Sequence, residues 1–347
     1  MKTKTAHLLF LAALVVAATL HSGCGDDSRK KTAAPTAPQT TTPAAGGVTN
    51  SAKTSSAPTP PAIPAATVAP KVRVSANVAG AVWREGDVFS AVVSLENNTS
   101  ADLAAIVKAD LSGASMSNSK TKKTFLKSGE KKRIFTFYTP EDDGVFTASG
   151  LRAERAQLNV SVATEAGEEL DKTTRDVFIY PLYDDAELAD ALRGVRIATS
   201  PTPEVLADLA AGKPVLLLAD AAAPPTFSLS GEAKSSLKAD IAHTRPLFEN
   251  FPTDATSGEQ WARLLSFASV VAVANLPVKI SPLVTFNPKT ALDNKNANKL
   301  VIGESVTVAD AGKITGKLLV CGISEKVLRA HPEGRHLLAC MAAYLCR

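Results

Sequence analysis

Beyond residue 70 the sequence alternates short apolar runs with polar turn residues such as Glu96-Asn97-Asn98. The predicted strands are Val72–Val74, Val88–Leu95, Leu103–Leu111, Lys122–Leu126, Arg133–Tyr138, Gly144–Leu151, Ala156–Ala163 and Thr174–Tyr180. Short strands at this spacing are typical of an immunoglobulin-like β-sandwich. We therefore expect such a domain over residues 71–181. The Cys–Trp–Cys signature of antibody domains is absent from this stretch.

After Pro181 the pattern changes to helices alternating with strands. The predicted elements are helix Ala186–Leu192, strand Val195–Ala198, helix Glu204–Leu209, strand Val215–Leu218, strands Val270–Val273, Leu283–Phe286, Leu300–Ile302, Ser305–Val308 and Lys317–Ile323, and helix Gly334–Leu345. Asp184 and Asp185 stand where the first helix needs an N-cap, which favours capping over acid–base chemistry. A strand, a helix and a second strand in succession form a β-α-β unit. We expect an α/β domain over residues 182–347 with a mainly parallel sheet.

Basic residues gather around the turn Ser128-Gly129. They are Lys120, Lys122, Lys123, Lys127, Lys131, Lys132 and Arg133. Alternation in the following Ile134–Tyr138 predicts a β-hairpin with the lysines on its solvent face. Contact with an anionic glycan or a lipid headgroup is the alternative interpretation.

The first 24 residues predict a secretory signal peptide. Two lysines precede the apolar run Leu8–Leu20, which is too short to span a bilayer. Leu20-His21-Ser22-Gly23-Cys24 resembles a bacterial lipobox, which implies that Cys24 receives lipid and becomes the new N-terminus. We expect an exported protein anchored to a bacterial membrane through Cys24, at the periplasm or the cell surface. A plain exported protein is the alternative.

Residues 25–70 consist mainly of Ala, Pro, Thr and Ser, with few large apolar side chains. Such a segment buries too little apolar surface to offset the entropy of ordering. Its prolines favour extended conformations. We expect a disordered tether that holds the following domains away from the membrane.

Composition and motifs argue against several functions. The net charge of +4 is modest, so nucleic acid is not an expected partner. The sequence has no G-x-S-x-G, H-E-x-x-H, C-x-x-C or Gly-rich phosphate loop. His331 and His336 are five apart, which fits no helical metal spacing. We expect no metal, no cofactor and no catalytic group. Cys340 and Cys346 lie on different sides of one predicted helix and cannot bridge each other.

Three segments near the C-terminus carry a resemblance. They are PLFENFPTDATSGEQW (246–261), GKLLVCGIS (316–324) and EGRHLLACMAAYL (333–345). Their order resembles the C-terminal accessory region of bacterial family 2 glycoside hydrolases of the β-galactosidase type. That resemblance implies an immunoglobulin-like sandwich followed by a class I glutamine-amidotransferase-like domain. Those enzymes carry their catalytic carboxylates on a separate barrel, which needs about 250 residues and has no room here.

The same resemblance suggests where a ligand would bind. Trp261 would offer a flat face to a sugar ring, and His243 and Asp254 would add polar groups. Trp261 packed in the core is the competing interpretation. The turn after Val215–Leu218 carries no Cys, Ser or Thr where an amidotransferase-like protein has its nucleophile.

These observations favour a non-catalytic, membrane-tethered envelope protein. We expect it to act in carbohydrate recognition or protein–protein assembly, with a glycan or an envelope protein as partner. One alternative is a detached accessory subunit of a glycoside hydrolase whose barrel lies on another chain. A purely structural envelope protein is the other.

Overall fold

The computed structural model describes residues 71–113, 117–138, 152–222, 238–271, 273, 276–286, 299–306 and 316–347. The signal peptide expected at 1–24, with Cys24, and the tether expected at 25–70 lie outside the described residues. The strand expected at Gly144–Leu151 lies outside them too.

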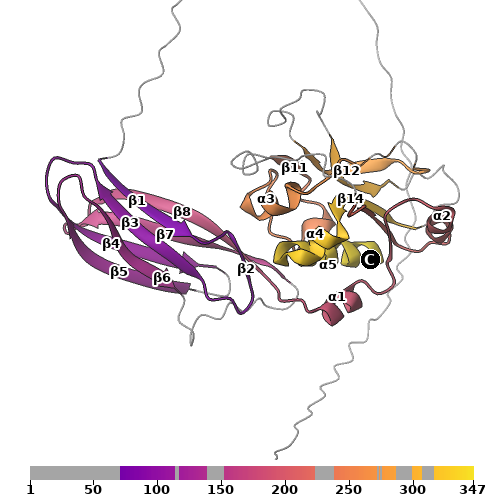
Figure 1. The fold of residues 1–347 in the computed structure, drawn as a ribbon, viewed down its shortest axis with the longest axis horizontal. Helices are drawn as coiled ribbons and strands as arrows, with labels where there is room; N and C mark the ends of the chain where they lie inside the picture. The colour runs from indigo at the N-terminus through magenta and orange to yellow at the C-terminus, as the bar shows by residue number, and fades with distance from the viewer. Residues whose placement is uncertain are drawn as a thin grey trace, which may run out of the picture. The chain divides into compact units, whose positions relative to one another are not determined.

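Side chains of alternating burial build two β-sheets from the segment after Lys71 (Figure 1). The strands are β1 (Val72–Val78), β2 (Val82–Arg84), β3 (Ser90–Asn97), β4 (Leu103–Ser112), β5 (Ser117–Leu126), β6 (Lys131–Tyr138), β7 (Glu154–Thr164) and β8 (Glu169–Tyr180). One sheet has the order β1-β3-β6 and the other β2-β8-β7-β4-β5. In β4, Val107 and Ala109 are buried while Lys108 between them is exposed, as the period of two requires. One hydrophobic core takes side chains from both sheets, so the segment is a β-sandwich.

The basic cluster does not lie on a hairpin, which corrects that prediction. β5 pairs with β4 in one sheet, and β6 pairs with β3 in the other. The turn at Gly129, whose φ of 70° suits glycine, therefore crosses between the sheets. Lys120 and Lys122 reach across from β5 to β6. Their Nζ atoms donate to the main-chain oxygens of Thr136 at 3.1 Å and Ile134 at 2.8 Å.

A third sheet lies in the C-terminal part of the chain. Its strands are β9 (Arg196–Ala198), β10 (Val215–Ala219), β11 (Ala239–Ile241), β12 (Ile280–Phe286), β13 (Leu300–Ser305) and β14 (Leu318–Ser324), in the order β11-β12-β13-β14-β10-β9. The pairs β9–β10 and β10–β14 are parallel, but the other three pairs are antiparallel. The sheet is mixed, so the prediction of a mainly parallel sheet was wrong. No helix was expected between the strands after residue 270, and strands without a crossover helix favour antiparallel pairing.

Helices and one 3₁₀ turn complete this part. They are α1 (Asp185–Ala191), α2 (Pro203–Ala210), η2 (Pro246–Phe248), α3 (Glu259–Leu265), α4 (Glu325–Ala330) and α5 (Pro332–Cys346). Asp184 is the N-cap of α1: its carboxylate accepts from the Glu187 amide, while Glu187 bonds back to the Asp184 amide. The capping interpretation of Asp184 is confirmed.

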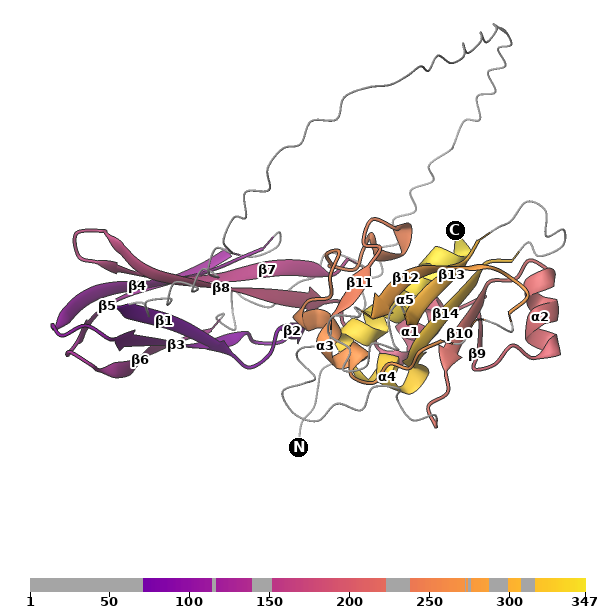
Figure 2. The ribbon, with the colours of Figure 1, turned by 90° about the horizontal axis from the view of Figure 1, so that it is seen from above.

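The mixed sheet is buried on both faces, which explains the continuous apolar run of β10. Leu216 and Leu218 belong to the core on the α5 face, together with much of that helix. Val215 and Leu217 belong to a smaller core with Val205 and other residues of α2. Figures 1 and 2 show α2 and α5 as separate layers against the sheet.

Candidate functional site

The end of the sandwich shares a core with the α5 face of the mixed sheet. Phe178 and Tyr180 of β8, and Ala153 just before β7, are buried in the same cluster as Trp261 and the side chains of α5. The two parts therefore meet through apolar contact as well as through the chain. We call this region the junction. Polar groups gather around it.

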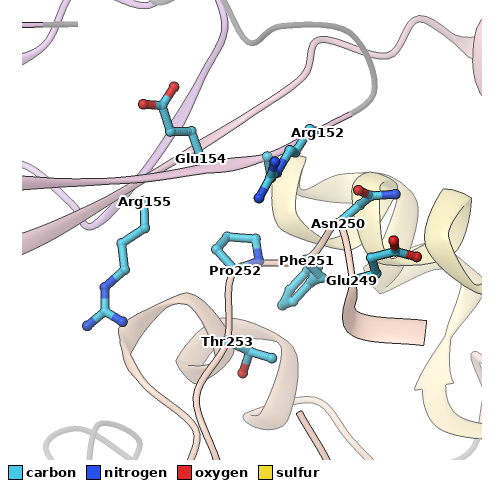
Figure 3. Close-up of a pocket in the computed structure, with 9 residues that line it drawn as sticks. Arg152, Glu154, Arg155, Glu249, Asn250, Phe251, Pro252 and Thr253 are labelled. Atoms are coloured by element: carbon cyan, nitrogen blue, oxygen red, sulfur yellow. The ribbon is translucent and has the colours of Figure 1, made fainter. Parts of the chain in front are cut away.

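A groove of 390 Å³ opens at the junction (Figure 3). One wall is formed by Arg152–Arg155 at the start of β7, and the other by Glu249–Thr253 after η2. Figure 3 shows Arg152 and Arg155 on one side of the groove and the loop that carries Pro252 on the other. The volume lies in the range of small-molecule sites. The lining is largely charged or polar, which suits a ligand rich in hydroxyl groups.

Ion pairs hold the Arg155 wall in place. Its Nη1 donates to Asp254 Oδ2 at 2.9 Å and its Nη2 to Asp176 Oδ2 at 2.5 Å. The hydrogen bond to Asp176 raises the pKa of Arg155, although burial opposes this. Burial acts to raise the pKa of Asp176. Hydrogen bonds from Arg155 and Gln157 act the other way, and the pKa of Asp176 is lowered overall. Arg155 thus fixes the loop after η2 against the sandwich.

The loop that forms the other wall rests on a buried histidine, His336 of α5. Its Nε2 lies 2.7 Å from Asn250 O, a carbonyl that only accepts, so Nε2 carries the proton. Nδ1 then accepts from the Tyr183 hydroxyl at 3.2 Å. The ring stacks on Phe251, with centroids 6.1 Å apart. Burial lowers the pKa of His336 to about 4, so the ring is neutral at physiological pH.

The buried cysteines near the site are unsuited to nucleophilic chemistry. Burial raises the pKa of the Cys321 and Cys340 thiols to about 12. A thiol must ionise to attack, so neither serves as a nucleophile at neutral pH. Both are free, as is the exposed Cys346. Among the described residues no group of three His, Cys, Asp or Glu could hold a metal ion. In the same part of the chain, no helix is long and apolar enough to cross a membrane.

Trp261 has no exposed face for a sugar. It is 0 % exposed and packs between Phe248 and Phe251, with ring centroids 6.1 and 5.0 Å away. Its Nε1 donates to Thr253 Oγ1 at 2.9 Å. The core interpretation of Trp261 is therefore confirmed, and its role as a stacking platform is withdrawn. Its large apolar area instead supports the loop that lines the groove.

His243 and Asp254 do not meet around Trp261. His243 is exposed in the loop after β11 and is not among the residues that line the groove. Asp254 is 65 % exposed and directs its carboxylate to Arg155. Of the three predicted residues, Asp254 alone contributes to the groove, as a support for its wall. The sequence analysis did not single out Arg155 or the structural role of His336. It did include the segment PLFENF, which contains Glu249–Phe251 of the groove wall.

A family model described as a domain of unknown function, DUF8487, matches residues 196–347. No curated protein sequence matches the chain. Three solved structures are similar to this chain over part of its length. Pseudomonas fluorescens alkylpurine DNA glycosylase AlkC, bound to DNA containing an abasic site analog, has 17 % identity and a TM-score of 0.23. Bacillus subtilis sporulation control protein Spo0M has 12 % identity and a TM-score of 0.25. Listeria innocua β-glucosidase in complex with glucose has 16 % identity and a TM-score of 0.22.

The overlaps are short. They cover 31, 35 and 31 % of this chain, and 30, 54 and 16 % of the three structures in the same order. The chain thus spans less than two thirds of each, at TM-scores too low to assign a fold or a function.

Replacing Trp261 with alanine should destabilise the protein strongly. The change removes a fully buried ring and leaves a cavity beside Phe251, which typically costs about 3–5 kcal/mol. Urea denaturation measures the free energy of unfolding. Phe267→Ala is the control, because that ring is 43 % exposed and surface changes usually stay within about 0.5 kcal/mol. Equal losses in the two variants would contradict the core position of Trp261.

Stability should fall as the pH drops from 6.5 towards 4. Histidine titrates near 6.5 in the unfolded chain, whereas burial holds the pKa of His336 at about 4. The unfolded state therefore binds the proton first, and stability that is complete above pH 6.5 is lost on acidification. Between pH 6.5 and pH 4 this proton uptake lowers the free energy of unfolding by about 3 kcal/mol.

Urea titrations at pH 7, 6 and 5 measure this slope. His336→Gln should flatten it, whatever the variant's stability at pH 7. His331 is the matched control because burial, and then Arg263, lower its pKa less markedly. His331→Gln should keep the larger part of the slope. An unchanged slope in His336→Gln would show that other groups set the pH dependence.

Proposed function

We propose that this chain is a non-catalytic binding module of the cell envelope, and that it recognises a glycan in the groove at the junction. In this proposal the sandwich is the immunoglobulin-like module and the mixed sheet with its helices is the amidotransferase-like module. The observation that carries the proposal is the polar groove itself. It presents guanidinium, carboxylate and amide groups together, in a cavity large enough for one or two sugar rings.

The two walls of the groove are held in place by other side chains, which favours binding of a ligand there. Arg155 is held by two carboxylates, and the opposite loop is held by His336 and Trp261. Little side-chain entropy is then lost when a ligand binds. The groove does not expose a large aromatic face, since Phe251 is buried. We therefore expect weak binding through hydrogen bonds, with a millimolar dissociation constant, equivalent to about −4 kcal/mol.

Arg152→Ala should weaken glycan binding by about tenfold. Arg152 is exposed at the rim of the groove and has no ion pair with a described residue, so its donors are available to a ligand. The full-length Cys24→Ala protein is titrated with a glycan panel, and chemical-shift changes give the dissociation constants. Arg193→Ala removes an exposed arginine paired with Asp190 at the end of α1 and should change nothing.

Three results would overturn the proposal. The first is the absence of glycan binding while a protein partner is captured, which would favour assembly. The second is binding that Arg152→Ala leaves intact. The third is turnover of chromogenic glycosides or glutamine that is lost when an acidic residue is replaced.

Export and lipid attachment at Cys24 complete the proposal. Bacterial lipidation adds several acyl chains, and two or more hydrophobic anchors give stable membrane attachment. Cys24→Ala should therefore move the protein from the membrane to the soluble fraction. Intact-mass analysis of the wild type should show cleavage before Cys24 and added lipid. Cleavage elsewhere without lipid would contradict the anchor.

A further inference from the structure

The basic cluster of β5 and β6 concentrates positive charge on one side of the sandwich. Lys120–Arg133 contains seven basic residues and one acidic residue, whereas the whole chain has a net charge of only +4. The rest of the chain is therefore slightly negative. All seven basic side chains are exposed, and they are Lys120, Lys122, Lys123, Lys127, Lys131, Lys132 and Arg133.

Most of these charges have no acidic partner. Five of the seven form no ion pair with a described residue, and the exceptions are Lys123 with Glu165 at 3.5 Å and Lys131 with Glu96 at 3.9 Å. Lys120 and Lys122 donate to main-chain carbonyls, which leaves their charges uncompensated. Elsewhere on the sandwich, Arg155 and Lys172 are paired with carboxylates. The basic cluster therefore offers its charge to a partner from outside.

Hydrogen bonds hold the turn of the basic cluster in place. The buried Asn97 donates through Nδ2 to Lys127 O at 3.1 Å, and its amide donates to Glu130 O at 2.9 Å. The Lys127 amide donates to Glu130 Oε2 at 2.8 Å. The Ser128 amide donates to Asp102 Oδ1 at 3.0 Å. These two carboxylates thus accept from the amides of the turn, and the lysine side chains extend from a fixed main chain.

The chain enters the sandwich at the end that carries this turn. Lys71, the residue before β1, accepts through its main-chain oxygen from the Asn98 amide at 2.7 Å. Asn98 directly follows Asn97, which holds the turn. The residues before Lys71, with the proposed lipid site Cys24, are therefore connected to the sandwich beside the basic cluster. A membrane is thus the anionic surface that this connection favours.

An exposed phenyl ring accompanies the charges. Phe125 is 53 % exposed, and the alternation along β5 places it on the same face as Lys123. Basic residues beside an exposed aromatic ring are typical of surfaces that contact the headgroup region of a bilayer. The ring and the entry point together favour a lipid surface over a soluble anionic glycan.

We propose that the basic cluster docks the sandwich onto a membrane surface rich in anionic phospholipid. The lipid phosphates accept from the ammonium and guanidinium groups, and Phe125 adds apolar contact. Each Lys or Arg close to an anionic membrane typically strengthens attachment about fivefold, so several acting together suffice for docking. The inference rests on the proposed membrane location and does not depend on the glycan groove.

Flotation of the full-length Cys24→Ala protein with lipid vesicles measures docking without lipid attachment. One set of vesicles contains phosphatidylcholine alone, and the other contains equal parts of phosphatidylcholine and phosphatidylglycerol. The protein should bind the anionic vesicles more tightly, and added salt should remove the difference because it screens exposed charges. Lys2, Lys4 and the apolar run Leu8–Leu20 are present in every variant, so comparisons between variants exclude their contribution.

Lys127→Glu combined with Lys132→Glu should weaken binding to the anionic vesicles by at least about tenfold, with no change on neutral vesicles. Both side chains are exposed and have no partner among the described residues, so the variant should stay folded. Lys127→Gln combined with Lys132→Gln removes the charges without reversing them and should have a smaller effect. The matched control is Lys279→Glu combined with Lys326→Glu, at exposed positions of the C-terminal part. It changes the net charge equally and should stay within about twofold of the parent.

Lysine acetylation followed by mass spectrometry locates the contact without altering the basic cluster. On anionic vesicles, Lys127, Lys131 and Lys132 should lose most of their reactivity, because the lipid surface covers them. Lys279 and Lys326 should keep theirs. Neutral vesicles should protect neither group.

Equal affinity for the two kinds of vesicle, or full affinity in Lys127→Glu with Lys132→Glu, would overturn the proposal. Equal losses in the control would overturn it too, since net charge and not the basic cluster would then set binding. Binding to polygalacturonate without binding to anionic vesicles would assign the basic cluster to an anionic glycan instead. Arg152→Ala should leave vesicle binding unchanged, because Arg152 lines the groove. Failure of the groove and failure of the basic cluster are therefore distinguishable.

Discussion

The imidazole of His336 joins three segments that are distant in the sequence. One nitrogen donates to Asn250 O after η2, and the other accepts from the Tyr183 hydroxyl beyond β8. The ring itself belongs to α5 and is surrounded by Tyr180 and Phe251. In such apolar surroundings a lost hydrogen bond costs about 1–3 kcal/mol. The neutral histidine thereby fixes both the start of the C-terminal part and one wall of the groove.

The charged groups of the junction differ in how they are paired. At the groove, Arg155 is balanced by Asp176 and Asp254, so its wall is complete without a ligand. Glu333, in the first turn of α5, is buried instead, and its partner is Arg263, whose Nε lies 3.7 Å from Oε1. The first arrangement contributes rigidity, whereas the second keeps a carboxylate out of water with one guanidinium beside it. One junction thus combines a pre-formed surface with an incompletely satisfied interior.

Much of the fold could be predicted from residue patterns, because alternation and capping are local. The strands around Val107 and Leu216 and the cap at Asp184 follow from near neighbours. Sheet membership could not be predicted, since β5 and β6 look like a hairpin in sequence but join different sheets. The site was harder still. Arg155 and Asp254 are ninety-nine residues apart, and nothing local to either indicates that they pair.

The lysines that cross from β5 to β6 have a consequence for how this protein meets copies of itself. β6 is an edge strand, and an incoming strand would need its free main-chain groups. Two of its carbonyls already accept from Lys120 and Lys122, and a positive charge stands where the new strand would lie. Neutralising these side chains, for example by acetylation, would remove the protection. The same bonds that close the gap between the two sheets thus keep this edge from serving as a template for aggregation.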